Sequence, residues 1–159
     1  RDLLQSGDFS LGGLYLTLGG QWNMASGASV TTSNGLFADV TGTATLGDLT
    51  TTASAADLDI SAYSFAASDA NSLWKTQNLL RLNAYGGNIG ASSRYVTLAG
   101  KALDVSATTG AIYANLAAGI SSGTLLSAGS QYLNSLGDLS LNSVTSNNAS
   151  VQLRGTGLV

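Results

Sequence analysis

A short phrase that recurs at intervals of 20 residues constrains the fold of this chain most strongly. Glycine occupies positions 7, 27, 47 and 87, and three of these glycines open similar sequences: Gly7-Asp8-Phe9, Gly47-Asp48-Leu49 and Gly87-Asn88-Ile89. The phrase returns after a longer interval at Gly137-Asp138-Leu139. A fixed period of roughly 20–50 residues is the signature of repeat architectures, in which each unit packs against its neighbours. The chain is therefore expected to be a stack of similar units.

Each unit has the pattern of short β-strands separated by small corners. Within 87–116, apolar and polar residues alternate in 95–98, 103–106 and 111–114, with Gly, Ala, Ser and Thr between these runs. Alternation with a period of two is typical of strands, because successive side chains point to opposite faces. The hairpin dipeptide Asn-Gly occurs only at Asn34-Gly35. This predicts an all-β fold, a parallel β-solenoid of three walls and about 20 residues per turn.

The alternation also predicts which side chains point into the solenoid. Gly-Asp pairs are expected at the corners, because Gly accepts a positive φ and Asp can bond its own backbone. The inward residues should include Leu11, Leu16, Leu18, Val30, Leu36, Val40, Leu49, Leu58, Ile60, Leu82, Ile89, Val96, Leu98, Leu103, Val105, Ile112, Leu116, Leu139, Leu141, Val151 and Leu153. One turn cannot offset its own conformational entropy, so neighbouring β-helix turns are expected at both ends.

The composition excludes several kinds of catalytic site. The chain has no His, Cys, Glu or Pro, which excludes the usual triads, zinc sites and thiol nucleophiles. Asp57 and Asp59 are the best candidates for an enzyme, since paired carboxylates can carry out acid/base chemistry on sugars. Their position beside inward Leu58 and Ile60 favours instead two solvated, outward side chains. We therefore predict no enzyme activity, no cofactor and no metal site.

Charge and aromatic residues narrow the choice of partner. Six cations scattered along a chain of net charge −3 do not favour nucleic acid, which requires clustered Lys and Arg. Exposed aromatic rings can stack on sugar rings or on a protein partner. The sequence favours partial burial of these rings at corners over a continuous binding stripe. The residues predicted as ligand or partner contacts are Tyr15, Tyr63, Trp74 and Tyr113.

The domain organisation is predicted from the length of the chain and from one interruption of the 20-residue repeat. At 159 residues the chain suits a single unit, and residues 1–159 are predicted to be one β-helix segment. It starts at Arg1, and we expect it to be a fragment of a longer repetitive rod. The polar stretch 67–78, which contains Trp74, interrupts the pattern and is predicted to be a loop excursion, with a helical turn capped by Asp69 as an alternative for part of it.

Two stretches carry a resemblance to a known family. Gly86-Gly87-Asn88-Ile89-Gly90 precedes an alternating run, and Gly137–Leu141 precedes Val144-Thr145-Ser146-Asn147. In these features residues 79–159 resemble the repetitive shaft of filamentous-haemagglutinin-type bacterial adhesins, whereas 1–78 share only the Gly-Asp corners. The Asn-Pro-Asn-Gly signature of the secretion domain of such proteins does not occur in this chain.

The resemblance implies a right-handed parallel β-helix that is secreted or displayed on the bacterial cell surface. It implies export through an outer-membrane β-barrel transporter, by two-partner secretion or as an autotransporter, and contact with a host-cell or neighbouring-cell receptor or glycan. The function expected from it is a structural shaft segment of a large adhesin that mediates attachment or cell-cell contact. Two alternatives stay open: a β-helix enzyme acting on polysaccharide, and an autotransporter passenger that associates with copies of itself.

Overall fold

The regular structure of the chain is entirely β in the computed structural model, which describes residues 1–147 and 149–156. The first strands are β1 (Leu3–Gln5), β2 (Phe9–Leu11), β3 (Leu14–Leu18), β4 (Trp22–Met24), β5 (Ser29–Thr32), β6 (Leu36–Leu46), β7 (Asp48–Thr51) and β8 (Leu58–Ala67). They are followed by β9 (Leu73–Lys75), β10 (Leu79–Ala84), β11 (Val96–Ala99), β12 (Ala102–Ala107), β13 (Ile112–Leu116), β14 (Ser122–Ser127), β15 (Gln131–Ser135), β16 (Ser143–Ser146) and β17 (Val151–Gly155).

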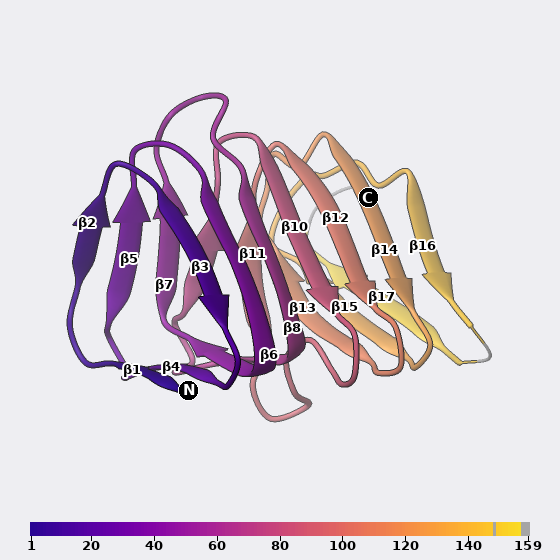
Figure 1. The fold of residues 1–159 in the computed structure, drawn as a ribbon. Helices are drawn as coiled ribbons and strands as arrows, with labels where there is room; N and C mark the ends of the chain where they lie inside the picture. The colour runs from indigo at the N-terminus through magenta and orange to yellow at the C-terminus, as the bar shows by residue number, and fades with distance from the viewer. Residues whose placement is uncertain (148, 157–159) are drawn as a thin grey trace.

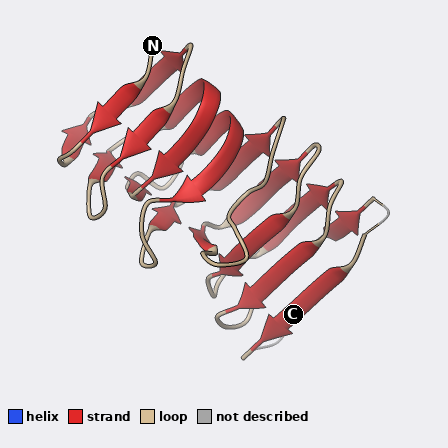
Figure 2. Cartoon of the chain, turned by 90° about the horizontal axis from the view of Figure 1, so that it is seen from below, coloured by secondary structure: helices blue, strands red, loops and turns tan. Residues whose placement is uncertain are grey.

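The strands stack in parallel, each on the strand one turn away (Figures 1 and 2). One wall, here called wall A, contains β3, β6, β8, β10, β12, β14 and β16. The opposite wall, wall C, contains β2, β5, β7, β9, β11, β13, β15 and β17. Leu58 pairs with Leu36 on one side and with Leu80 on the other, both 22 residues away, while Thr124 pairs with Ser143, 19 residues away. The predicted parallel β-solenoid is confirmed, with a turn length that varies around 21 residues.

The cross-section changes along the stack. In the first turns a third wall contains β1, β4 and the second halves of β6 and β8, and the pairing of β6 with β8 shifts between Val40 and Thr43, where the chain passes from wall A to this third wall. Farther on, the third wall narrows to Ile89, which bridges Phe65 and Ile112. Only the corner 108–111 separates β12 from β13, too few residues for another strand. The expected triangular turns are therefore present at the N-terminal end only.

The Asp and Asn residues of the repeated phrase hydrogen-bond across turns. The Ser29 amide donates to Asp8 Oδ1 at 2.9 Å, the Leu73 amide to Asp48 Oδ1 at 2.8 Å, and the Ala111 amide to Asn88 Oδ1 at 2.8 Å. The expectation that these side chains bond their own backbone is wrong at these three corners. The carboxylate or amide instead satisfies an N–H at the start of a strand in a neighbouring turn, which links successive turns.

Three of the five glycines of the repeated phrase are required for space: Gly47, Gly87 and Gly137, where a Cβ would lie within 3 Å of another turn. In the described residues, positive φ occurs at Gly27, Gly90 and Gly119, so of the predicted corner glycines only Gly27 adopts it. At Gly47 a Cβ would lie 2.0 Å from the carbonyl oxygen of Ala28 on the preceding turn. Close stacking of main chains at the corner excludes any side chain there, which explains this glycine without positive φ.

The core is a continuous apolar column inside the stack. Most predicted inward residues, from Val30 to Leu139, are buried, whereas Leu16, Leu18 and Leu141 are partly buried. Three predicted inward residues are 39–42% exposed: Leu11, Val151 and Leu153. These lie on β2 and β17, strands that pair on one side only in the described structure. Burial in a solenoid thus depends on a neighbour on both sides.

Candidate functional site

The structure places the predicted contact tyrosines on separate parts of the surface. Tyr15 on β3 is 83% exposed and stacks on Phe37 with ring centroids 5.0 Å apart. Tyr63 on β8 is 49% exposed and meets Tyr85 edge-on at 6.0 Å. Tyr113, on β13 of wall C, is half-buried. The predicted contacts therefore do not form one site.

Trp74, predicted to contact a ligand or partner, lies instead inside the stack. Its side chain is fully buried, packs against Phe65 with ring centroids 5.9 Å apart, and donates from Nε1 to the Gly47 carbonyl at 2.9 Å. In the stretch 67–78, residues 68–72 form turns, with no helix, and Leu73–Lys75 return to wall C as β9. Trp74 therefore occupies an inward position of a strand, and a surface ligand cannot reach it.

The carboxylate pair considered for sugar cleavage lies at β8 in wall A, and both side chains are partly buried. Asp57 Oδ1 accepts from Asn78 Nδ2 at 2.7 Å and from the Leu79 amide at 3.1 Å. Asp59 Oδ2 pairs with Arg81 Nη1 at 3.0 Å, and Arg81 Nε pairs with Asp104 at the same distance. The hydrogen bonds that Arg81 donates to Asp104 and to Asp59 raise the pKa of Arg81. The guanidinium of Arg81 is thus shared between two carboxylates, one on the turn before it and one on the turn after it, and all three side chains are partly exposed.

A row of three tyrosines crosses wall C near its C-terminal end. The rings of Tyr113 and Tyr132 stack nearly parallel, 4.9 Å apart at 4°, and Tyr95 meets Tyr113 edge-on at 5.8 Å. Tyr113 pairs in register with Tyr132 on the next turn, and all three rings are half-buried. Tyr113 and Tyr132 lie on strands of the wall, contrary to the sequence-based preference for corner burial, whereas Tyr95 lies just before β11.

An amide row runs beside the tyrosines. Asn115 pairs with Asn134 in register, and Asn134 Nδ2 donates to Asn115 Oδ1 at 3.0 Å. Asn115 Nδ2 in turn donates to Thr97 Oγ1 at 3.4 Å. The repeat Tyr-x-Asn, found at 113–115 and again 19 residues later at 132–134, is the sequence signal that could have revealed both rows. This repeat lies outside the glycine phrase from which the turns were predicted.

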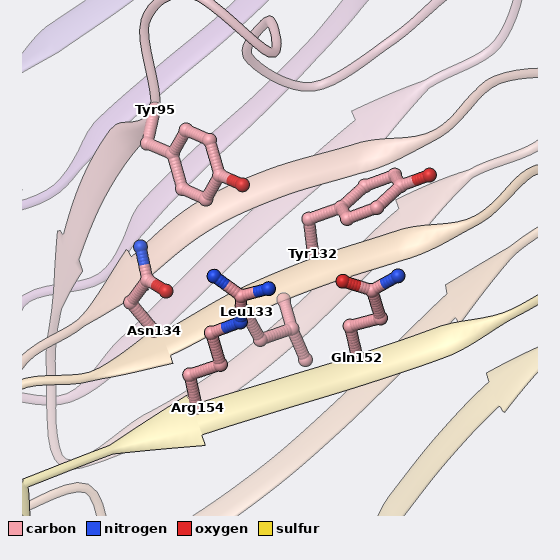
Figure 3. Close-up of a pocket in the computed structure, with 6 residues that line it drawn as sticks. All are labelled: Tyr95, Tyr132, Leu133, Asn134, Gln152 and Arg154. Atoms are coloured by element: carbon pink, nitrogen blue, oxygen red, sulfur yellow. The ribbon is translucent and has the colours of Figure 1, made fainter.

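The two rows end at a hollow of about 190 Å³ (Figure 3). Tyr132 pairs with Gln152 and Asn134 with Arg154, so β17 adds an amide and a guanidinium to the rows. In Figure 3, Tyr132, Gln152 and Arg154 point to the same side of the sheet. The hollow is lined by Tyr95, Tyr132, Leu133, Asn134, Gln152 and Arg154. We call this surface, together with Tyr113 and Asn115, the tyrosine–amide face.

The charge of the tyrosine–amide face differs from that of wall A. Strands β9, β11, β13, β15 and β17 contain no acidic residue, and their charged residues are Lys75 and Arg154. Arg154 is exposed and makes no ion pair within the described residues. Wall A carries Asp39, Asp59 and Asp104 on its strands. The protein is acidic overall, but this face carries an unpaired cation.

Comparison of the chain with protein-family models, with curated proteins and with solved structures finds no match. Over the residues that the structure describes, Asp residues form no cluster of three or more that could hold a metal ion. The same part of the chain contains no helix long and apolar enough to cross a membrane.

Proposed function

We propose that this chain is a structural shaft segment of a large secreted or surface-anchored bacterial adhesin, which mediates attachment or cell-cell contact. The observation that carries the proposal is the uninterrupted parallel stack, in which one apolar column runs through successive turns while the polar residues of each wall face outward. Such a stack extends in one direction by adding turns, which suits a spacer that holds a binding tip away from a cell.

The ends of the stack support this role. Phe9 and Leu11 on β2, and Val151 and Leu153 on β17, present inward-type apolar side chains that are 39–46% exposed. Within the described residues β2 and β17 each pair on one side only, and such strand edges with exposed core residues are suited to further β-helix turns of the same kind. The sequence resemblance to adhesin shafts favours passage through an outer-membrane β-barrel transporter and a position at the cell surface.

Deletion of the segment from the full-length parent protein tests the proposal. About seven turns at a strand spacing of roughly 4.8 Å correspond to about 35 Å of fibre. We expect antibodies raised against residues 1–159 to label intact producing cells, and an in-frame deletion to shorten the surface fibre by about this length in cryo-electron micrographs. Labelling only after permeabilisation, or a fibre of unchanged length, would contradict the shaft role.

A further inference from the structure

We propose that the tyrosine–amide face binds a negatively charged saccharide chain, whose carboxylate or sulfate group is held by Arg154. This function goes beyond the shaft role and does not depend on it. The binding would take place along the side of the stack rather than at a tip. It rests on the arrangement of rings, amides and charge across β11, β13, β15 and β17.

The tyrosine row supplies the apolar part of such a site. Sugar rings present C–H groups that pack on aromatic faces and edges, and the half-buried rings of Tyr113 and Tyr132 are fixed by stacking on each other. Fixing the rings before binding lowers the entropy cost of ordering them around a ligand. Tyr95 and Tyr132 both line the hollow, so a sugar ring bound there would contact aromatic carbon from two different turns.

The amide row supplies hydrogen bonds for hydroxyl groups. The amide nitrogen of Asn134 donates to Asn115, so Asn134 Oδ1 is left as an acceptor with no partner within the described residues. Gln152, exposed on the next strand, offers a donor and an acceptor from one side chain. Alternating donors and acceptors suit vicinal hydroxyls, each of which donates and accepts.

Arg154 determines the charge of the ligand. Its guanidinium lines the hollow and has no carboxylate partner in the described part of the chain. Its own strand, β17, contains no acidic residue. A guanidinium binds carboxylate or sulfate through two parallel hydrogen bonds, a geometry that a neutral sugar cannot use. By contrast, Arg81 on wall A is already paired with Asp59 and Asp104.

The size of the hollow is consistent with a chain rather than a compact ligand. Its 190 Å³ is below the roughly 300 Å³ at which enclosed small-molecule pockets begin. One sugar ring would occupy the hollow, and the next rings would follow the two rows across successive turns, spaced by about 4.8 Å. A saccharide chain, which repeats one sugar ring after another, therefore suits a surface whose tyrosine and amide rows repeat from turn to turn.

Isothermal titration calorimetry of the 159-residue chain at low ionic strength tests the proposal. The probes are tetragalacturonate, which carries carboxylates, a chondroitin sulfate tetrasaccharide, which also carries sulfate, and neutral maltotetraose. We expect at least one acidic probe to bind and maltotetraose to bind at least about tenfold more weakly. Which acidic probe binds more tightly identifies the preferred anionic group. No binding of either acidic probe, or equal affinity for maltotetraose, would overturn the proposal.

Variants locate the binding on the surface. Arg154→Gln and Tyr132→Ala should each weaken binding of the acidic probe by about tenfold. Tyr15→Ala on wall A and Lys101→Gln at a corner are matched controls that should leave the affinity unchanged, and thermal melting checks that every variant is folded. Equal losses in the controls would show that binding is not at this face. Neither result affects the shaft role, which the fibre-length experiment tests separately.

Discussion

At the scale of single residues, stacking restricts a few positions by space alone. Main chains of successive turns approach closely at the corners, so a Cβ at Gly110 would lie 2.2 Å from the Gly87 carbonyl oxygen. At Gly90 the restriction is double, because φ is +74° and a Cβ would lie 2.3 Å from the Tyr113 carbonyl oxygen. Each such contact couples one residue to the position of a whole turn.

Gly90→Ala should therefore destabilise the fold. Left-handed backbone costs a non-glycine residue roughly 1–2 kcal/mol, and displacement of the Tyr113 main chain adds to that. We expect a loss of at least about 2 kcal/mol, or a melting temperature lower by about 5 °C or more. The control Gly12→Ala, where a Cβ would meet nothing within 4 Å, should change stability by less than about 0.5 kcal/mol. Equal effects of the two substitutions in calorimetric melting would refute this explanation.

At the scale of elements, a corner loop connects turns that are not adjacent. The loop 68–72 places Asp69 Oδ2 3.0 Å from the Gly27 amide and 3.2 Å from Ser26 Oγ, about two turns back along the chain. Asp69 Oδ1 accepts from the Asn71 amide at 2.9 Å. The hydrogen bond from the Gly27 amide, followed by that from the Asn71 amide, lowers the pKa of Asp69 below 3.8. The carboxylate thus holds an exposed loop against the corner of an earlier turn.

This arrangement predicts a pH dependence with a definite sign. Because the native pKa of Asp69 lies below its unfolded value of 3.8, its contribution to stability is fully present above that pH and is lost as pH falls through the native value. The difference in unfolding free energy between the wild type and Asp69→Asn should therefore shrink when urea denaturation is repeated below pH 3.8. The control Asp39→Asn, whose carboxylate has no hydrogen-bond or ion-pair partner in the described residues, should change the unfolding free energy at neutral pH by less than about 0.5 kcal/mol. A difference that stays constant with pH would exclude this role of Asp69.

At the scale of the whole molecule, stability depends on position along the stack. An inward residue in a central turn is covered by turns on both sides, whereas one on an end strand is covered on one side only. Leu98 on β11 is fully buried, and Leu11 on β2 is 39% exposed. The two leucines represent the same kind of wall position in different surroundings.

Leu98→Ala should lower the unfolding free energy by about 2–5 kcal/mol, the usual cost of a buried cavity, and Leu11→Ala by about 1 kcal/mol or less. Urea denaturation of both variants, with the slope of the transition compared to the wild type, measures the difference. If both substitutions cost the same, the end turn would be packed as tightly as the centre, contrary to the exposure seen here.

How much could be predicted from the sequence depended on the range of the interactions. Alternation in 58–62 is a local property of a strand, so inward Leu58 and Ile60 and outward Asp57 and Asp59 were predictable. The same rule could have identified Trp74 as inward, but the polar residues around it concealed a strand of three residues. The recurring Gly-Asp phrase indicated corners, though not the cross-turn bonds that Asp8 and Asp48 make.

The amino-acid sequence by itself determined that this chain forms a parallel stack of turns around an apolar interior. Side-chain alternation within each strand and a repeat near 20 residues are both visible along the chain without knowledge of its tertiary contacts. Which outer side chains meet was decided by the tertiary structure alone. Corner lengths differ from turn to turn and set the register between strands, and the register brings Tyr113 onto Tyr132 and Arg81 between two aspartates. The loss of the third wall after Ile89 has the same origin, since it depends on where successive corners close.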